Sequence, residues 1–194
     1  MEHKHHGKSS AKYLDSEEIL SELNIKGDET FLDAGCGDGY ISKNAVENYL
    51  PDGKVYAVDL YDESINDLKS FIIENDIDNL TAIEADITES IPGVDDDSVD
   101  VVFMLNVFHG FDESGREGVI KEFERIIKSD GRIAIMEFKP IEMDWGPPMD
   151  IRLSHAELEK LFSNHDFKKT YLNVDIGKDI GEAKSHYLII FEKE

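Results

Sequence analysis

Three glycines at alternate positions form the first group of residues whose type and spacing point to chemistry. Gly35, Gly37 and Gly39 follow the apolar run 30–34 and stand directly before helical sequence that begins at Tyr40. Glycine has no Cβ, so such a loop can adopt positive φ angles and let a ligand lie against bare backbone at a helix N-terminus. We therefore predict a ligand-binding loop here; a tight turn without a ligand is the alternative.

Asp59 ends the next apolar run, 54–59, about twenty residues beyond the glycines, where nucleoside-binding α/β units carry an acidic residue. A carboxylate at this place can accept hydrogen bonds from both hydroxyls of a ribose. The alternative is a role in capping the next helix, but Asp62 and Ser64 can serve that purpose. We predict a ligand with a nucleoside part, held at its ribose by Asp59.

The elements that must position these residues follow from the alternation of apolar runs with amphipathic segments, which is typical of a parallel sheet covered on both faces. Strands are predicted at 30–34, 54–59, 80–85, 99–105 and 132–137, and two more near 169–174 and 186–192. The last two have a short connection, which indicates an antiparallel hairpin at the edge of the sheet. The predicted fold class is α/β, with three layers and a mostly parallel seven-stranded sheet that has an antiparallel edge strand.

Helices are predicted where apolar residues recur on one face with a period of 3.6 residues. In the clearest of them, Ser114 and Glu117 are expected to form a capping box at the start. Its buried face consists of Val119, Ile120, Phe123, Ile126 and Ile127. Ser154 and Glu157 repeat the capping pattern before a shorter helix, and residues 15–23 are predicted to form an N-terminal one.

The composition limits the size and surroundings of this fold. A chain of 194 residues, 40% of them hydrophobic, can form one domain, which we place at 13–194 after a flexible segment at 1–12. The formal charge of −23 disfavours nucleic acid as a partner, because a phosphate backbone would be repelled. The single cysteine, Cys36, excludes an internal disulfide and a multi-cysteine metal site, and no apolar run is long enough to span a membrane. We expect a cytoplasmic monomer or homodimer without a bound metal.

The glycine loop and Asp59 together resemble the class I S-adenosylmethionine-dependent methyltransferases, and the resemblance extends over most of the chain. The pattern Asp33-x-Gly35-x-Gly37-x-Gly39 is similar to their first motif and differs in spacing from the G-x-G-x-x-G of dinucleotide-binding oxidoreductases. The segment after the fourth predicted strand is similar to the ubiquinone- and menaquinone-pathway group and related small-molecule methyltransferases. The resemblance implies a Rossmann-like methyltransferase fold and S-adenosylmethionine as the cofactor, with S-adenosylhomocysteine as its product.

The resemblance also implies how the cofactor is held. Asp33 would orient the loop and the amino-acid end of the cofactor, and Asp59 would hold the ribose. Leu60 would flank the adenine, and Asp86 with Ile87 would meet the adenine edge. The full set of expected cofactor-binding residues is Asp33, Gly35, Cys36, Gly37, Gly39, Asp59, Leu60, Asp86, Ile87 and Asn106.

The methyl acceptor is expected just beyond Asn106, whose backbone would contact the methionine part of the cofactor. Methyl transfer mainly needs the nucleophile, the methyl carbon and the sulfur to lie in one line, so a base is optional. His109 is the best-placed candidate for a catalytic base, because an ordinary histidine pKa of about 6.5 suits proton removal near neutral pH. Its alternative role is structural, as a helix cap or a packing partner of Phe108.

A segment rich in proline and large apolar residues follows the fifth strand, from 137 to 149, and is predicted to wall or cover an apolar acceptor; simple cover for the sheet edge is the alternative. Arg152 could bind a carboxylate of the acceptor or form a surface ion pair. In the quinone-pathway relatives the N-terminal segment folds over the acceptor, which brings in Tyr13. The expected substrate pocket comprises Tyr13, Phe108, His109, Phe138, Trp145 and Arg152.

Two absences narrow the reaction that the resemblance implies. The chain lacks the Asn-Pro-Pro-aromatic tetrapeptide of enzymes that methylate nucleobase and glutamine nitrogens, and its lone cysteine disfavours arsenite, which needs several cysteines. The expected function is in-line methyl transfer to a small molecule or to a protein side chain. The alternatives are a cofactor-binding module without activity and a nicotinamide-dependent oxidoreductase.

Overall fold

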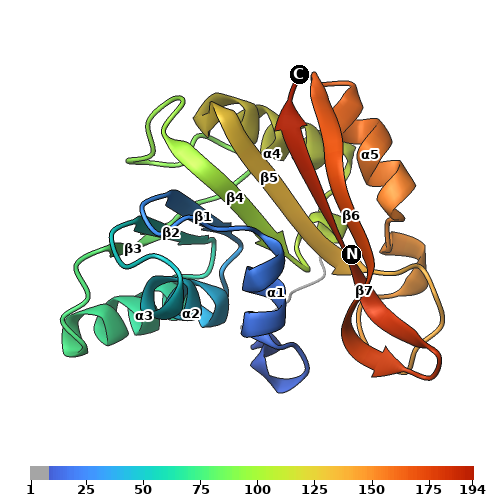
Figure 1. The fold of residues 1–194 in the computed structure, drawn as a ribbon, viewed down its shortest axis with the longest axis horizontal. Coiled ribbons are helices and arrows are strands. Elements are labelled where there is room, and N and C mark those ends of the chain that lie inside the picture. Colours follow the sequence, from blue (N-terminus) through green and yellow to red (C-terminus); the bar gives the residue numbers. More distant parts are fainter. Residues whose placement is uncertain (1–8) are drawn as a thin grey trace.

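The computed structural model of the chain describes residues 9–194 and shows a seven-stranded sheet between two layers of helices (Figure 1). The strands are β1 (Thr30–Ala34), β2 (Lys54–Asp59), β3 (Leu80–Glu84), β4 (Val99–Leu105), β5 (Ile127–Phe138), β6 (Phe167–Ile180) and β7 (Ala183–Lys193). They lie in the order β3-β2-β1-β4-β5-β7-β6, and β1 to β5 are parallel. β7 is antiparallel to both of its neighbours, so it lies one place in from the rim that β6 forms. The predicted three-layer α/β fold with an antiparallel hairpin at one edge is confirmed.

The helices divide between the two faces of the sheet. They are α1 (Ser16–Glu22), α2 (Tyr40–Asn48), α3 (Asp62–Glu74), α4 (Glu113–Ile126) and α5 (His155–Ser163), with short 3₁₀ turns η1 (Ser10–Lys12), η2 (Phe108–Gly110) and η3 (Met149–Ile151). α1, α2 and α3 cover one face, and α4 and α5 the other (Figure 1). Along β4, Val101 and Phe103 face the core between the sheet and α1, α2 and α3. Val102 and Met104 face the core between the sheet and α4 and α5. A strand buried on both sides needs such a continuous apolar run.

The observed helix cap matches the prediction for α5 and differs from it for α4 and α3. The capping box of α5 is confirmed, because the Ser154 side chain accepts from the Glu157 N–H at 3.3 Å and Glu157 Oε2 accepts from the Ser154 N–H at 2.8 Å. The box predicted at Ser114 is wrong. Asp112, an equally good capping residue, stands in extended backbone and accepts from the Gly115 N–H at 2.9 Å, so α4 begins one residue before Ser114.

The predicted caps of α3 are also wrong, since Asp62 and Ser64 lie inside that helix and Tyr61 precedes it without a side-chain cap. Three strands are longer than predicted: β5, β6 and β7 run past their apolar stretches because backbone pairing with a neighbour continues there. Residue 127, predicted as helical, is the first residue of β5.

The predicted flexible segment 1–12 lies largely outside the described residues. Of its last four residues, Ser9 caps a single 3₁₀ turn, η1, by accepting from the Ala11 N–H at 3.3 Å. Within residues 9–194, no helix is long and apolar enough to cross a membrane.

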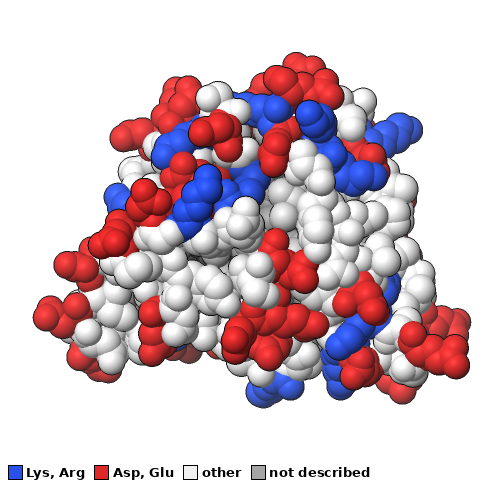
Figure 2. All heavy atoms as spheres, viewed as in Figure 1, with Lys and Arg blue, Asp and Glu red and all other residues white. Residues whose placement is uncertain are grey.

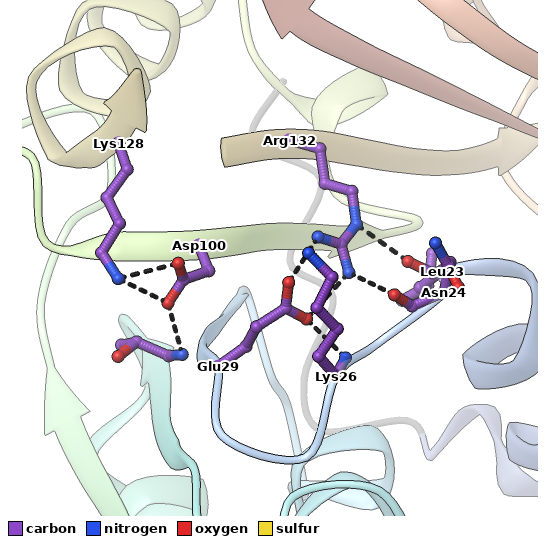
Figure 3. Close-up of polar contacts among 8 residues, drawn as sticks. Leu23, Asn24, Lys26, Glu29, Asp100, Lys128 and Arg132 are labelled. Atoms are coloured by element: carbon purple, nitrogen blue, oxygen red, sulfur yellow. Dashed lines mark hydrogen bonds and ion pairs between the residues drawn. The ribbon is translucent and has the colours of Figure 1, made fainter. Parts of the chain in front are cut away.

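Charged side chains gather differently at the two ends of the sheet. Figure 2 shows acidic side chains around much of the molecule and a group of basic ones close to where β4 and β5 begin. There Arg132 donates to both carboxylate oxygens of Glu29, at 2.9 and 3.0 Å, and Lys128 contacts both oxygens of Asp100 at 2.7 Å (Figure 3). Asp100 also accepts from the Thr30 N–H at 2.8 Å. These bonds join β1, β4 and β5 at their amino ends.

Candidate cofactor and acceptor site

The carboxyl ends of β1, β2 and β4 open onto a cavity of about 550 Å³. Ligands of open α/β sheets bind at this end of the strands, in cavities of roughly 300–1,000 Å³. The wall includes Ser10, Tyr13, Asp33, Gly35, Cys36, Gly37, Asp38, Tyr40, Ile41, Asp59, Leu60, Tyr61, Ala85, Asp86, Ile87, Leu105, Asn106, Val107, His109, Gly110, Phe111, Phe138, Trp145, Gly146 and Pro147. Most of the predicted site residues are therefore brought together, and Gly39, Phe108 and Arg152 are not on this wall.

The glycine loop lies at the mouth of β1 with Gly35, Gly37 and Gly39 all at positive φ. A Cβ on Gly37 would meet nothing within 4 Å, so its bare backbone faces open space in the cavity. A Cβ on Gly35 would lie 2.5 Å from a methyl carbon of Val107, which makes that glycine necessary for packing. Gly39 precedes the first residue of α2 and packs against Leu68, so its role is to start the helix.

Asp59 holds the loop to the end of β2. Its Oδ2 accepts from the Gly37 N–H at 2.8 Å and its Oδ1 from the Tyr61 N–H at 3.0 Å. The carboxylate is nearly buried, and two main-chain donors hold it against the cavity wall. Each of its oxygens has a second lone pair, so a rigid acceptor pair is presented to the cavity.

Asp33 lies beneath the loop and is fully enclosed. Its Oδ2 accepts from the Ser42 hydroxyl of α2 at 2.6 Å. Burial, together with the nearby charges of Asp59 and Asp38, raises the pKa of Asp33 to about 7 against the opposing effect of the Ser42 bond. The protonation of this carboxyl therefore changes close to neutral pH, and a cationic ligand would favour its charged form.

The far end of the cavity beyond β2 and β3 has apolar and acidic walls. Leu60 is 60% exposed and Ile87 is buried, and both side chains lie on the cavity wall. Asp86 accepts from both the backbone N–H and the hydroxyl of Thr88, at 2.9 and 2.7 Å. These contacts fix Asp86 in the turn that follows β3.

Asn106 lies directly after β4. Its φ is +59°, a left-handed conformation that asparagine adopts more readily than most residues, and its backbone N–H donates to Met136 O at 2.9 Å. Its Oδ1 is buried and has no hydrogen-bond partner within residues 9–194. A buried oxygen without a donor costs about 1–3 kcal/mol, so the site suits a ligand that brings a donor, such as an ammonium group.

His109 is held by a residue that the sequence analysis did not select. Its Nδ1 lies 2.7 Å from Glu137 Oε2, and its backbone N–H donates to Glu137 Oε1 at 3.2 Å. Both side chains are buried, and His109 lines the cavity while Glu137 stands at the end of β5. The available signal was a single charge in the apolar run 133–138. Phe108 instead packs in the core against Phe111 and Phe162.

Three aromatic side chains from distant segments form the wall near His109. The Tyr13 and Trp145 rings have centroids 5.0 Å apart, and the Phe138 and Trp145 rings 5.2 Å. Phe138 ends β5, Trp145 lies in the following loop, and Tyr13 follows η1. Pro147, on the same wall, lies in the segment 137–149 that was predicted to wall or cover the acceptor, whereas Phe111 was not selected, because no periodic pattern marks it.

Arg152 lies behind this wall. Neither role predicted for it, a contact with an acceptor carboxylate or a surface ion pair, agrees with this position. Its side chain is 9% exposed, and within the described part of the chain it forms neither an ion pair nor a contact with the cavity. Its guanidinium donates instead to main-chain carbonyls of the segment 139–147. Such a contact cannot be read from the sequence, because it depends on the path of a loop without periodic structure.

Comparisons with known proteins agree with this geometry. Residues 25–192 match the family profile of a methyltransferase domain. The chain belongs to the class I S-adenosylmethionine-dependent methyltransferases. A SAM-dependent methyltransferase from Aquifex aeolicus is 25% identical, with a TM-score of 0.79 over 92% of this chain and 89% of that one. A type 11 methyltransferase from Sulfolobus solfataricus is 24% identical, with a TM-score of 0.70 over 93% of each chain. The predicted family and cofactor are thereby confirmed.

One curated relative of this methyltransferase has a named substrate. An arsenite methyltransferase from Halobacterium salinarum is 33% identical over 109 residues, which cover 56% of this chain and 27% of the relative. The chain thus spans about a quarter of that relative's length. Cys36 is buried in the loop, and burial together with the charges of Asp33 and Asp59 raises the pKa of its thiol. A lone protonated thiol is a poor ligand for arsenic(III).

The cavity of this methyltransferase also has a clear charge. Of its described wall residues, Asp33, Asp38, Asp59 and Asp86 are acidic and none is lysine or arginine. S-adenosylmethionine carries a positive sulfonium and an ammonium group, so this wall fits the cofactor. The buried Asn106 oxygen and the bare Gly37 backbone fit it as well.

Proposed function

We propose that this methyltransferase methylates a small, largely apolar molecule that carries no negative charge. The observation that supports this most directly is one cavity that extends from the glycine loop to the aromatic residues Tyr13, Phe138 and Trp145, with His109 on its wall. Four aspartates and no lysine or arginine among its described wall residues would repel a carboxylate or phosphate. A walled space of this kind also favours an enzyme over a module that only binds the cofactor.

The residues proposed to hold the cofactor are those of the glycine loop and its surroundings. S-adenosylmethionine, when bound, supplies an electrophilic methyl group on a positively charged sulfur. Gly37 offers bare backbone, Asp59 offers carboxylate oxygens to the ribose hydroxyls, and Asn106 Oδ1 offers an acceptor to the ammonium group. Leu60 and Ile87 enclose the adenine, and Asp86 meets its edge. Of the other residues that the resemblance implies, Asp33, Gly35 and Cys36 also lie on the cavity wall, whereas Gly39 acts on α2.

His109 is the proposed base for an acceptor whose nucleophilic atom carries a proton. An imidazole that donates from Nδ1 to Glu137 has its lone pair on Nε2, and that atom can take a proton. His109 Nε2 would take the proton that the acceptor gives up as its new bond to the methyl carbon replaces the methyl–sulfur bond, whose electron pair leaves with the sulfur. Glu137 holds the ring in position, so it is a positioning residue.

Calorimetry with two ligands tests the proposal at the cofactor. We expect S-adenosylhomocysteine to bind and NAD to give no heat, because the glycine spacing and the wall suit the former. Binding of NAD alone would contradict the assignment and favour an oxidoreductase.

Transfer itself is tested with labelled S-adenosylmethionine and a cell extract of the source organism, fractionated by size. We expect the label in the small-molecule fraction, in compounds without acidic groups. Label found only in protein, or only in carboxylates or phosphates, contradicts the proposed acceptor class. Cofactor binding without any transfer supports a binding module instead.

A further inference from the structure

The loop between β5 and η3, residues 139–148, is organised around one buried guanidinium. Arg152 Nε donates to Pro147 O at 2.9 Å, and Nη2 donates to Trp145 O at 3.1 Å. Nη1 donates to Ile141 O at 2.7 Å and to Lys139 O at 3.4 Å. One side chain therefore donates to four carbonyls that belong to no helix or strand ladder, of which Lys139 O also accepts from the Ile141 N–H at 2.8 Å.

An arginine suits this arrangement better than any other residue. Guanidinium has five donors in a planar fork and keeps its charge when it is partly desolvated, whereas lysine has three donors on one atom. Within residues 9–194, Arg152 has no carboxylate partner, so its charge is balanced by the carbonyl dipoles and by the face of the Phe138 ring. Its bonds are thus made entirely to the backbone path of the loop.

The same loop is fixed from its inner side by Phe138. Gly146 has a φ of +90°, and a Cβ on it would lie 2.8 Å from the Phe138 ring, so the loop backbone contacts that ring directly. Arg152 stands 5.7 Å from the centroid of the Phe138 ring. His186, buried in β7, lies on the Phe138 ring with centroids 4.2 Å apart. The loop is therefore held from two sides.

Two of the residues whose carbonyls Arg152 binds, Trp145 and Pro147, are also wall residues of the cavity. We propose that Arg152 is a positioning residue that holds this loop as a rigid wall and thereby sets the fit of the methyl acceptor. The acceptor part of this inference rests on the proposed function. The wall part rests on the hydrogen bonds alone.

Trp145 is the only tryptophan in the chain, so its fluorescence reports on the loop directly. In the wild-type protein, the fluorescence anisotropy of Trp145 should decay with the tumbling of the whole molecule. A decay dominated by fast local motion of the indole would overturn the proposal without any variant.

Two substitutions remove the clamp to different degrees, and a third is the matched control. Arg152→Lys keeps the charge, Arg152→Met keeps the length, and Arg132→Met removes an arginine that also binds two backbone carbonyls, of Leu23 and Asn24, far from the cavity. We expect acrylamide to quench Trp145 more strongly in both Arg152 variants and unchanged in the control. Equal quenching in all folded proteins would overturn the proposal.

The acceptor is tested with the small-molecule fraction of the extract as the probe. In Arg152→Met, the amount of this fraction that gives half of the maximal rate should rise about tenfold, with affinity for S-adenosylhomocysteine changed less than about twofold. A fall in maximal rate without this rise contradicts the specificity role. If the wild-type protein labels nothing, the proposed function fails, while Trp145 fluorescence still decides whether Arg152 holds the wall. If Arg152→Met does not fold, Arg152→Lys and the wild-type anisotropy decide.

Discussion

At the amino end of the sheet, charged side chains are paired with one another, and at the carboxyl end they face a cavity. Arg132 and Lys128 hold Glu29 and Asp100 with contacts of 2.7 to 3.0 Å, and the Arg132 guanidinium also takes two backbone carbonyls (Figure 3). At the other end, four aspartates line a wall on which the described residues include no lysine or arginine. At the amino end the charged groups are paired within the protein, whereas at the carboxyl end the aspartates are available to a positively charged ligand.

The pKa values of one carboxyl at each end show the same contrast. Burial works against the ionised form of Glu29, but hydrogen bonds from Arg132 and the Lys26 N–H lower its pKa overall. Burial raises the pKa of Asp33 to about 7, and the Ser42 hydroxyl, which donates to it, does not offset that effect. Unfavourable local chemistry that persists in a fold usually belongs to a functional site, and the buried Asn106 Oδ1, which has no hydrogen-bond partner within residues 9–194, is a further example.

The largest expected effect comes from breaking the contact between His109 and Glu137 at the carboxyl end of the sheet. Glu137→Gln should lower the rate of methyl transfer by about a hundredfold or more, because the amide replaces one of the two carboxylate oxygens that contact His109 with an NH2 donor and removes the charge, and His109→Gln should do the same. The KM for S-adenosylmethionine should stay close to that of the wild type. Steady-state kinetics on the labelled fraction measure both quantities.

Glu29→Gln at the amino end is the matched control for that substitution. Both glutamates are buried, so both variants should lose stability, but only Glu137→Gln should lose turnover. An equal loss of rate in the two variants would show that His109 is not a base.

The next effect concerns the carboxylate that holds the glycine loop. Asp59→Asn should weaken binding of S-adenosylhomocysteine by about 10- to 100-fold, because hydrogen bonds to a charged acceptor are worth about 1.5–3 kcal/mol. Asp62→Asn, three residues further on in α3 and outside the cavity wall, should bind like the wild type. Titration calorimetry on both proteins checks this, and equal affinities would exclude a ribose contact by Asp59.

At the amino end the expected effect is on stability alone. Arg132→Met should lower the free energy of unfolding by about 3 kcal/mol, because it leaves the buried Glu29 charge without its partner. The melting temperature should fall by about 6–12 °C, and the affinity for S-adenosylhomocysteine should not change. A loss of cofactor affinity in this variant would show that the two ends are not independent.

A further effect is a dependence of stability on pH that differs from that of an ordinary carboxyl group. The pKa of Asp33 is raised on folding, so between its ordinary value of 3.8 and about 7 the folded protein binds more protons than the unfolded chain. Asp33 therefore stabilises the fold below this window, and the stabilisation is lost as pH rises through it. Urea unfolding of wild type and Asp33→Asn at several pH values isolates this contribution. An unchanged difference across the window would place Asp33 in an ordinary environment.

Ligand binding should show the opposite slope. Ionised Asp33 attracts a cation, so affinity for S-adenosylmethionine should rise by a few-fold from about pH 6 to about pH 8, and affinity for the uncharged thioether of S-adenosylhomocysteine should rise less. In Asp33→Asn, the affinities for the two ligands should change with pH to the same extent.

Local patterns in the sequence were enough for the sheet and the cofactor loop. A strand, three glycines and a helix lie next to one another in the chain, and Asp59 follows at the end of the adjacent strand, so parallel pairing alone brings it to Gly37. The cap of α5 could be predicted for the same reason, whereas that of α4 could not, because two capping residues stood within three positions.

Contacts between segments far apart in the chain were decided only by the tertiary structure. Glu137 reaches His109 because β5 lies beside β4, and the aromatic wall exists because η1, the end of β5 and the following loop meet at one place. Arg152 had been assigned to an acceptor or to solvent, since its four carbonyl partners have no side-chain signature. Patterns of residue type determine the local backbone and the cofactor loop that depends on it, and the packing of distant segments determines which molecule that cofactor meets.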